Sequence, residues 1–169
     1  DLLYVFFNVK NGNTHVAHYF DFINIASLNI GFDFQIDQLS SLFLLIITGI
    51  GFLIHVYSSS YMHEETNDHF ARFFAYLNLF VFSMLLLVLG ANFVIMFIGW
   101  EGVGLCSYLL IGFWYKNQDY NDAAKKAFIM NRVGDLGLLI GIFILAINLD
   151  TINFTDLNAG VVALNKTGG

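Results

Sequence analysis

The chain has 169 residues, of which 57% are hydrophobic, 17% aromatic and 12% charged, with a formal net charge of −6. A mean hydropathy of +0.68 is too high for an ordinary soluble domain, and the charged residues cluster between long apolar blocks. There is no basic patch or arginine-rich tract, which argues against a nucleic-acid-binding protein. The single cysteine, Cys106, excludes an internal disulfide and a thiolate metal cluster.

The first 38 residues do not follow a membrane-helix pattern. Residues 1–7 are apolar but too few to span a bilayer, so we expect them to be the end of a preceding helix. A polar loop follows, and apolar and polar residues then alternate over residues 28–36, which predicts a strand with one wet face. Residues 20–22 are expected to begin its antiparallel mate. An open hairpin edge cannot lie in lipid, so this β-hairpin is predicted to be extramembrane.

Residues 39–149 predict four transmembrane helices and therefore an all-α membrane protein. The four apolar blocks span residues 39–57, 70–89, 93–115 and 123–149. Each is long enough to cross a hydrocarbon core of ~30 Å, which takes about 20 helical residues. The last segment, residues 150–169, is polar and predicts a loop, with room for a short helix, leading toward further helices of a larger bundle.

Basic residues indicate the orientation. The connections over residues 57–72 and 115–126 lie on the same side of the membrane, and that side has Arg72, Lys116, Lys125 and Lys126. The opposite side has only Lys10 and Lys166. The positive-inside rule therefore predicts that the hairpin lies on the outer side.

Glu101 is the most informative single residue, because it lies alone in the uncharged third block. An ionised carboxylate at mid-membrane costs roughly 3 kcal/mol, so it requires a partner, a water-filled cavity or a proton. We expect a proton-carrying glutamate; the alternative is a static ion pair that only holds helices together. On an adjacent helical stripe, Gly99, Gly102 and Cys106 predict close approach of another helix.

Two further charged residues, Arg132 and Asp135, lie inside the fourth block. Their spacing of three allows them to pair on the same helix. Arg132 is expected either to hold Asp135 ionised or to reach a carboxylate on a neighbouring helix. We expect Gly134, Gly137 and Gly141 to be packing residues on the neighbouring face.

His55, near the inner end of the first block, is expected to be a proton-accepting group, since imidazole titrates near neutral pH. A haem held by two histidines would require a second one deep in another helix, which argues against a b-type cytochrome. No zinc spacing or phosphate-binding loop occurs, so no metal or cofactor site is predicted. Of the two tryptophans, Trp114 is expected to be an interfacial anchor and Trp100 to pack beside Glu101.

Four stretches resemble one known family. Residues 97–113 (FIGWEGVGLCSYLLIGF) are similar to the signature helix of chain 5, called subunit L in bacteria, of respiratory complex I. Residues 36–40, 51–58 and 126–135 agree with it in order and spacing, and the resemblance covers roughly residues 28–157. The large subunits of multisubunit cation/proton antiporters, which share the glutamate helix, are weaker relatives.

The resemblance implies an antiporter-like, proton-translocating subunit of NADH–quinone oxidoreductase. The family's glutamate corresponds to Glu101, and its arginine and aspartate on the next helix to Arg132 and Asp135. The lysine that pairs with the glutamate lies on a later helix that has no counterpart here. The resemblance also implies that flavin, iron–sulfur clusters, NADH and quinone belong to other subunits, with none in this chain.

The expected partners are other membrane-arm subunits, the lipid bilayer and the C-terminal helices of the same chain. The expected location is the bacterial inner membrane, with the mitochondrial inner membrane as the alternative. Two other functions remain open at this point. One is the large subunit of a sodium/proton antiporter, and the other is a structural spacer without a proton path of its own.

Overall fold

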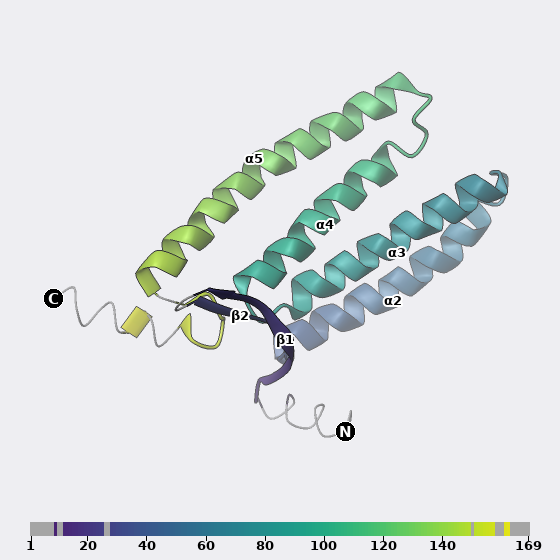
Figure 1. Ribbon diagram of the computed structural model, residues 1–169. Coiled ribbons are helices and arrows are strands. Elements are labelled where there is room, and N and C mark those ends of the chain that lie inside the picture. The colour runs from purple at the N-terminus through teal and green to yellow at the C-terminus, as the bar shows by residue number, and fades with distance from the viewer. Residues whose placement is uncertain (1–8, 10–11, 26–27, 150, 158–160, 163–169) are drawn as a thin grey trace.

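The computed structural model describes residues 9, 12–25, 28–149, 151–157 and 161–162. In this part of the chain, two strands are followed by four long helices (Figure 1). The helix end expected in residues 1–7, and most of the expected loop after residue 157, lie outside the described residues.

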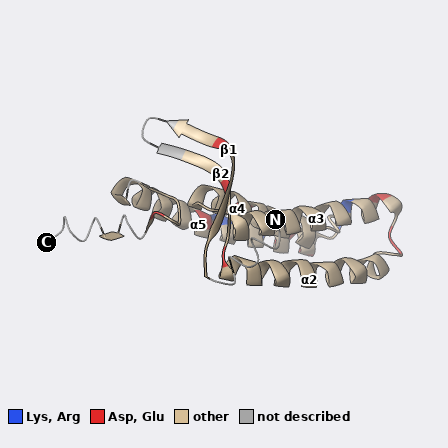
Figure 2. Cartoon of the chain, turned by 90° about the horizontal axis from the view of Figure 1, so that it is seen from below, with Lys and Arg blue, Asp and Glu red and all other residues tan. Residues whose placement is uncertain are grey.

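The predicted hairpin is confirmed. Strand β1 (His15–Ile25) pairs antiparallel with β2 (Leu28–Ile36), and the register places Phe20 opposite Phe32. Their rings stack with centroids 5.0 Å apart. The first strand begins earlier than residues 20–22, because the pairing continues through two irregularities in register. The hairpin projects from the layer of helices (Figure 2).

The four predicted membrane helices are also confirmed. They are α2 (Gln38–Tyr61), α3 (Asn67–Leu89), α4 (Phe93–Ile111) and α5 (Gln118–Leu149). All four are long and apolar enough to cross a membrane. They run alternately up and down, with α4 between α3 and α5 and with α2 against α3 (Figure 1). Their outer surfaces expose large apolar side chains, such as Leu45 on α2 and Ile147 on α5, as lipid or further helices require.

The contact between α3 and α4 is unusually close. A β-carbon at Gly99 would lie 2.4 Å from the backbone nitrogen of Leu87, and one at Gly102 would lie 2.5 Å from Oγ of Ser83. Cys106, on the same face of α4, is fully buried. The prediction that these small residues admit a neighbouring helix is therefore confirmed, because only hydrogen fits at the two glycines.

The glycines of α5 behave differently. A β-carbon at Gly134, Gly137 or Gly141 would meet no atom within 4 Å in the part of the chain that the structure describes. Their packing against another helix therefore stays a prediction, since the face of α5 that contacts α4 is the one that contains Asp135.

The start of α4 is fixed by hydrogen bonds from both sides. The backbone N–H of Ala91 donates to the carbonyl of Asp33 (3.1 Å), and the Asn92 side chain donates to the carbonyl of Gly31 (2.9 Å). The N–H of Phe93 donates to the carbonyl of Ile152, beyond the end of α5 (3.1 Å). The hairpin and the segment after α5 thus set the height of α4, and with it the height of its glutamate, relative to α5.

Candidate functional site

Glu101 and Arg132 form an ion pair between α4 and α5. An Arg132 Nη1 atom lies 2.5 Å from Oε2 of Glu101, and the guanidinium carbon lies 5.1 Å from the ring centroid of Phe128. Of the two partners expected for Arg132, the structure shows the carboxylate on the neighbouring helix. Glu101 therefore faces protein on one side, as its helical stripe predicts.

Glu101 is nevertheless not buried within this chain. Its side chain is 22% exposed and that of Arg132 is 53% exposed. Among the residues described, the buried charged side chain is that of Asp135, which is only 6% exposed. Within this chain Glu101 is thus the more exposed of the two acids, because α4 turns it toward the open side of its contact with α5 while Asp135 lies inside that contact. A buried glutamate in a proton path stays a prediction.

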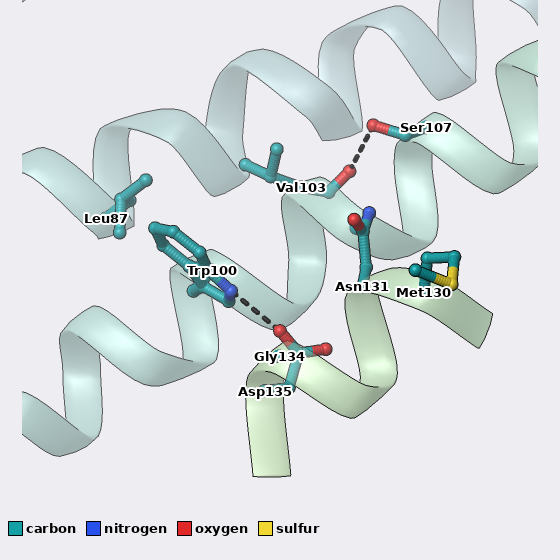
Figure 3. A pocket seen from close by; sticks show the side chains of 9 residues that line it. Leu87, Trp100, Val103, Ser107, Met130, Asn131, Gly134 and Asp135 are labelled. Carbon is teal, nitrogen blue, oxygen red and sulfur yellow. Dashed lines mark hydrogen bonds between the residues drawn. The ribbon is translucent and has the colours of Figure 1, made fainter. Parts of the chain in front are cut away.

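Asp135 accepts a hydrogen bond from the indole of Trp100. The distance from Nε1 of Trp100 to Oδ1 of Asp135 is 2.7 Å (Figure 3). Trp100 was expected only to pack beside Glu101, so its contact with Asp135 was not predicted from the sequence. The signal that could have found it is the indole N–H, a donor that needs an acceptor wherever water is absent.

Two cavities lie along the contact between α4 and α5, and Asp135 lines both. The first has a volume of about 320 Å³ and is lined by Leu87, Trp100, Val103, Gly104, Ser107, Met130, Asn131, Gly134 and Asp135 (Figure 3). The second has a volume of about 390 Å³ and is lined by Phe97, Glu101, Phe128, Ile129, Arg132, Val133, Asp135, Leu136 and Leu139. Asp135 therefore borders both the cavity that contains the ion pair and the separate pocket beside Trp100.

His55 is not brought to this cluster. It lies on α2, with Nδ1 2.7 Å from the carbonyl oxygen of Gly51 and its ring 6.0 Å from the ring of Phe74 on α3. Its Nε2 atom is buried and has no partner among the described residues. The role predicted for His55 in a proton path remains a prediction, since its contacts are with α3 and not with α4 or α5.

A second polar cluster lies at the end of the helices where α4 connects to α5. Trp114 donates its indole N–H to Oε1 of Glu65 (2.9 Å), and Nδ1 of His69 lies 2.9 Å from Oε2 of the same carboxylate. The hydrogen bond from Trp114, followed by that from His69, lowers the pKa of Glu65 below its usual value. Arg72 donates to the carbonyl of Phe113 (3.3 Å) and lies over its ring, so this cluster joins α3 to the connection before α5.

No metal site was found where the structure describes the chain, since no three of its histidine, cysteine, aspartate and glutamate side chains are grouped suitably. The candidate site is an arrangement of charges between membrane helices. Charged side chains are costly there, and in membrane proteins they mark ion and proton pathways. Fold and site together define an integral membrane helix bundle with charged side chains paired between its helices.

Comparisons with known proteins identify the family. Residues 22–74 match the family described as NADH-ubiquinone oxidoreductase (complex I), chain 5 N-terminus. Residues 90–168 match the family described as NADH:quinone oxidoreductase/Mrp antiporter, TM. The chain belongs to this family of antiporter-like chain 5, or subunit L, membrane proteins, and the resemblance inferred from the sequence is confirmed.

Individual relatives support the same family assignment. The chain is 52% identical over 147 residues to NADH-quinone oxidoreductase subunit L of Mycobacterium tuberculosis, covering 87% of this chain and 23% of the relative. It is 46% identical to subunit L of Escherichia coli over 89% of this chain and 24% of the relative. It is 40% identical to NADH-ubiquinone oxidoreductase chain 5 of Phytophthora infestans over 95% of this chain and 24% of the relative. The chain thus spans about a quarter of the length of these relatives.

Proposed function

We propose that this chain acts in a membrane-arm subunit of NADH–quinone oxidoreductase and translocates protons through carboxylates between its helices. The observation that supports this most directly is the Glu101–Arg132 ion pair between two membrane helices, with Asp135 one turn further along α5. The relatives named subunit L or chain 5 support the same assignment.

The chemistry divides the roles among these residues. A guanidinium stays protonated in proteins, so Arg132 supplies a fixed positive charge and does not carry the proton. The carboxylates of Glu101 and Asp135 are the groups that can bind and release one. A change in the position of Arg132, or of a further cation supplied by the rest of the subunit, changes the proton affinity of Glu101 and so moves a proton.

Electron transfer belongs to other subunits in this proposal. The chain contributes the proton path, while NADH, flavin, iron–sulfur clusters and quinone are bound elsewhere in the complex. Its partners are the neighbouring membrane-arm subunits, the bilayer and the remaining helices of its own subunit. The exposed apolar faces of α2 and α5 offer surfaces for the last two.

The test is Glu101→Gln in the parent complex, reconstituted into vesicles. Assembly, NADH–quinone turnover and proton uptake are measured together. We expect an assembled complex with strongly reduced pumping and slowed turnover, because glutamine keeps the shape but cannot carry a proton. Glu65→Gln, which changes a carboxylate outside the membrane helices, is the matched control. Normal pumping by Glu101→Gln would contradict the proposal and leave the pair as a helix anchor.

A sodium/proton antiporter subunit is the second candidate, because one of the two matching family descriptions includes the Mrp antiporters. The same vesicles distinguish the two functions. Sodium-dependent proton movement without NADH oxidation would favour the antiporter, whereas proton movement that requires NADH and is indifferent to sodium favours the complex I subunit. In a structural spacer, Glu101→Gln would change neither the proton pumping nor the NADH–quinone turnover of the complex.

A further inference from the structure

We propose that Trp100 is a positioning residue that holds Asp135 against a hydrated pocket, through which protons reach that carboxylate. The inference rests on the proposed function and assigns a role within it to the Trp100 indole and to the pocket lined by Asn131 and Ser107. Neither role follows from the Glu101–Arg132 pair, which lies in the other cavity.

Trp100 provides the hydrogen bond that Asp135 makes within the described part of the chain. Arg132, which is close enough along α5 to pair with Asp135, is engaged by Glu101 instead. A buried carboxylate in a low-dielectric environment depends strongly on each donor that it has. The neutral indole therefore fixes where the Asp135 carboxylate points without neutralising it.

The pocket beside this contact has two further polar side chains in its lining. One is the side-chain amide of Asn131. The other is the hydroxyl of Ser107, which donates to the carbonyl of Val103 (2.9 Å) and whose oxygen can still accept a hydrogen bond (Figure 3). With a volume of about 320 Å³, the pocket is large enough for several waters, each of which needs two to four polar partners.

The direction of the pocket follows from the helices that line it. Ser107 lies about two turns beyond Trp100 along α4, toward the connection to α5 that contains Trp114. That end has most of the basic residues and is the predicted inner side of the membrane. A chain of waters from Ser107 past Asn131 to Asp135 would therefore lead from the inner side to the carboxylate that also borders the ion pair.

Trp100→Phe in the full complex tests the inference, because phenylalanine keeps the ring and removes the N–H. We expect an assembled complex in which the rate of proton pumping falls roughly tenfold, because a misplaced proton-transfer group loses rate. The pH profile of pumping should also change. The infrared band of the Asp135 carboxyl, assigned by its loss in Asp135→Asn, should move. Trp114→Phe, which removes the other indole donor, should leave band and profile unchanged.

Two further variants complete the experiment. Trp100→His retains an N–H donor and should restore most of the pumping, and Trp100→Phe should add no further loss in the Asp135→Asn background. If Trp100→Phe does not assemble, Trp100→His distinguishes a positioning role of Trp100 from a packing role. An assembled, pumping histidine variant supports positioning, whereas failure of both variants would assign Trp100 to packing and overturn the inference.

The outcome is separable from that of the proposed function. An unchanged Asp135 band and normal pumping in Trp100→Phe, with Glu101→Gln still stalled, would overturn the role of Trp100 alone. Normal pumping in Glu101→Gln would contradict the proposed proton path through Glu101, whatever the infrared band shows.

Discussion

Arg132 pairs across the helix contact with Glu101, at 2.5 Å, and not with Asp135 one turn along its own helix. The two acids are therefore held by different groups, Glu101 by a cation and Asp135 by the neutral indole of Trp100. Among the described residues, Glu101 therefore has a cationic partner and Asp135 has a neutral hydrogen-bond donor.

The first prediction concerns Arg132, the cation of this pair. Arg132→Gln should destabilise the α4–α5 contact by about 1–3 kcal/mol, because it leaves the Glu101 carboxylate without its charge-assisted partner. The measurement is the thermal stability of the assembled complex in detergent, together with proton pumping in vesicles. Pumping should fall along with stability.

The double variant Glu101→Gln with Arg132→Gln separates the two effects. Two amides can hydrogen-bond where the ion pair was, so stability should largely recover while pumping stays low. Equal stability of Arg132→Gln and the unsubstituted complex would show that the pair contributes nothing measurable to the contact.

The helices and hairpin could be predicted because their signals are local. An apolar block of about 20 residues predicts a membrane helix wherever it occurs, and strict alternation over residues 28–36 predicts a strand. The close approach of another helix to α4 could also be predicted, since Gly99 and Gly102 share a helical stripe. These features depend on spacing within a single segment.

The details of the site could not be predicted for the opposite reason. The choice of Arg132 between two carboxylates, and the burial of Asp135 in place of Glu101, depend on the rotation of α4 relative to α5. Sequence spacing within one helix does not determine that rotation. The hydrogen bond from Trp100 to Asp135 joins residues 35 positions apart, and neither residue type indicates the other.

A second prediction follows from the α3–α4 contact. Gly99→Ala should destabilise the helix pair by about 1–3 kcal/mol, the usual effect of overpacking, because its β-carbon would lie 2.4 Å from the Leu87 backbone nitrogen. Assembly of the complex and its thermal stability are the measurements. Gly49→Ala is the matched control, since a β-carbon there meets nothing within 4 Å among the described residues. Equal stability of both variants would contradict the close contact.

A third prediction concerns the start of α2, where Asp37 caps the helix. Its Oδ1 atom accepts from the backbone N–H of Ser40 at 2.7 Å, and the Ser40 hydroxyl accepts from the N–H of Asp37 at 2.8 Å. Asp37→Ala should cost about 1 kcal/mol of stability, whereas Asp37→Asn, which keeps an acceptor, should cost less. Thermal denaturation of the two variants makes the comparison. A larger loss for asparagine than for alanine would be inconsistent with capping.

Asp37 also gives the cap a pH dependence. Burial raises the pKa of Asp37, but the hydrogen bonds from Ser40 and Gln35 outweigh it, and the pKa ends below its ordinary value of 3.8. The capping contribution is therefore complete above pH 3.8 and is lost as the pH falls through the lower, folded-state value. The difference between unsubstituted and Asp37→Asn chains should disappear under those acidic conditions.

A fourth prediction concerns Glu65, which lies in the connection between α2 and α3 and contacts Trp114. The hydrogen bonds from Trp114 and His69 lower its pKa below the ordinary value of 4.5, so the ionised carboxylate is the form that joins the two connections. A group whose pKa is lowered in the folded state stabilises the fold at pH values above its unfolded-state pKa. That contribution is lost as the pH falls through the folded-state pKa. The Trp114–Glu65 contact should therefore persist from neutral pH to pH 4.5 and weaken only below it.

A fluorinated tryptophan placed at position 114 reports this contact through its fluorine resonance. The resonance should stay constant between pH 7 and pH 4.5 and move at lower pH, in the direction already shown at neutral pH by Glu65→Ala, which lacks the acceptor. Glu65→Gln keeps an acceptor that does not titrate, so its resonance should be independent of pH throughout. A midpoint above pH 4.5 in the unsubstituted chain would show that the hydrogen bonds do not favour the ionised form, and Trp114 would then be an interfacial anchor alone.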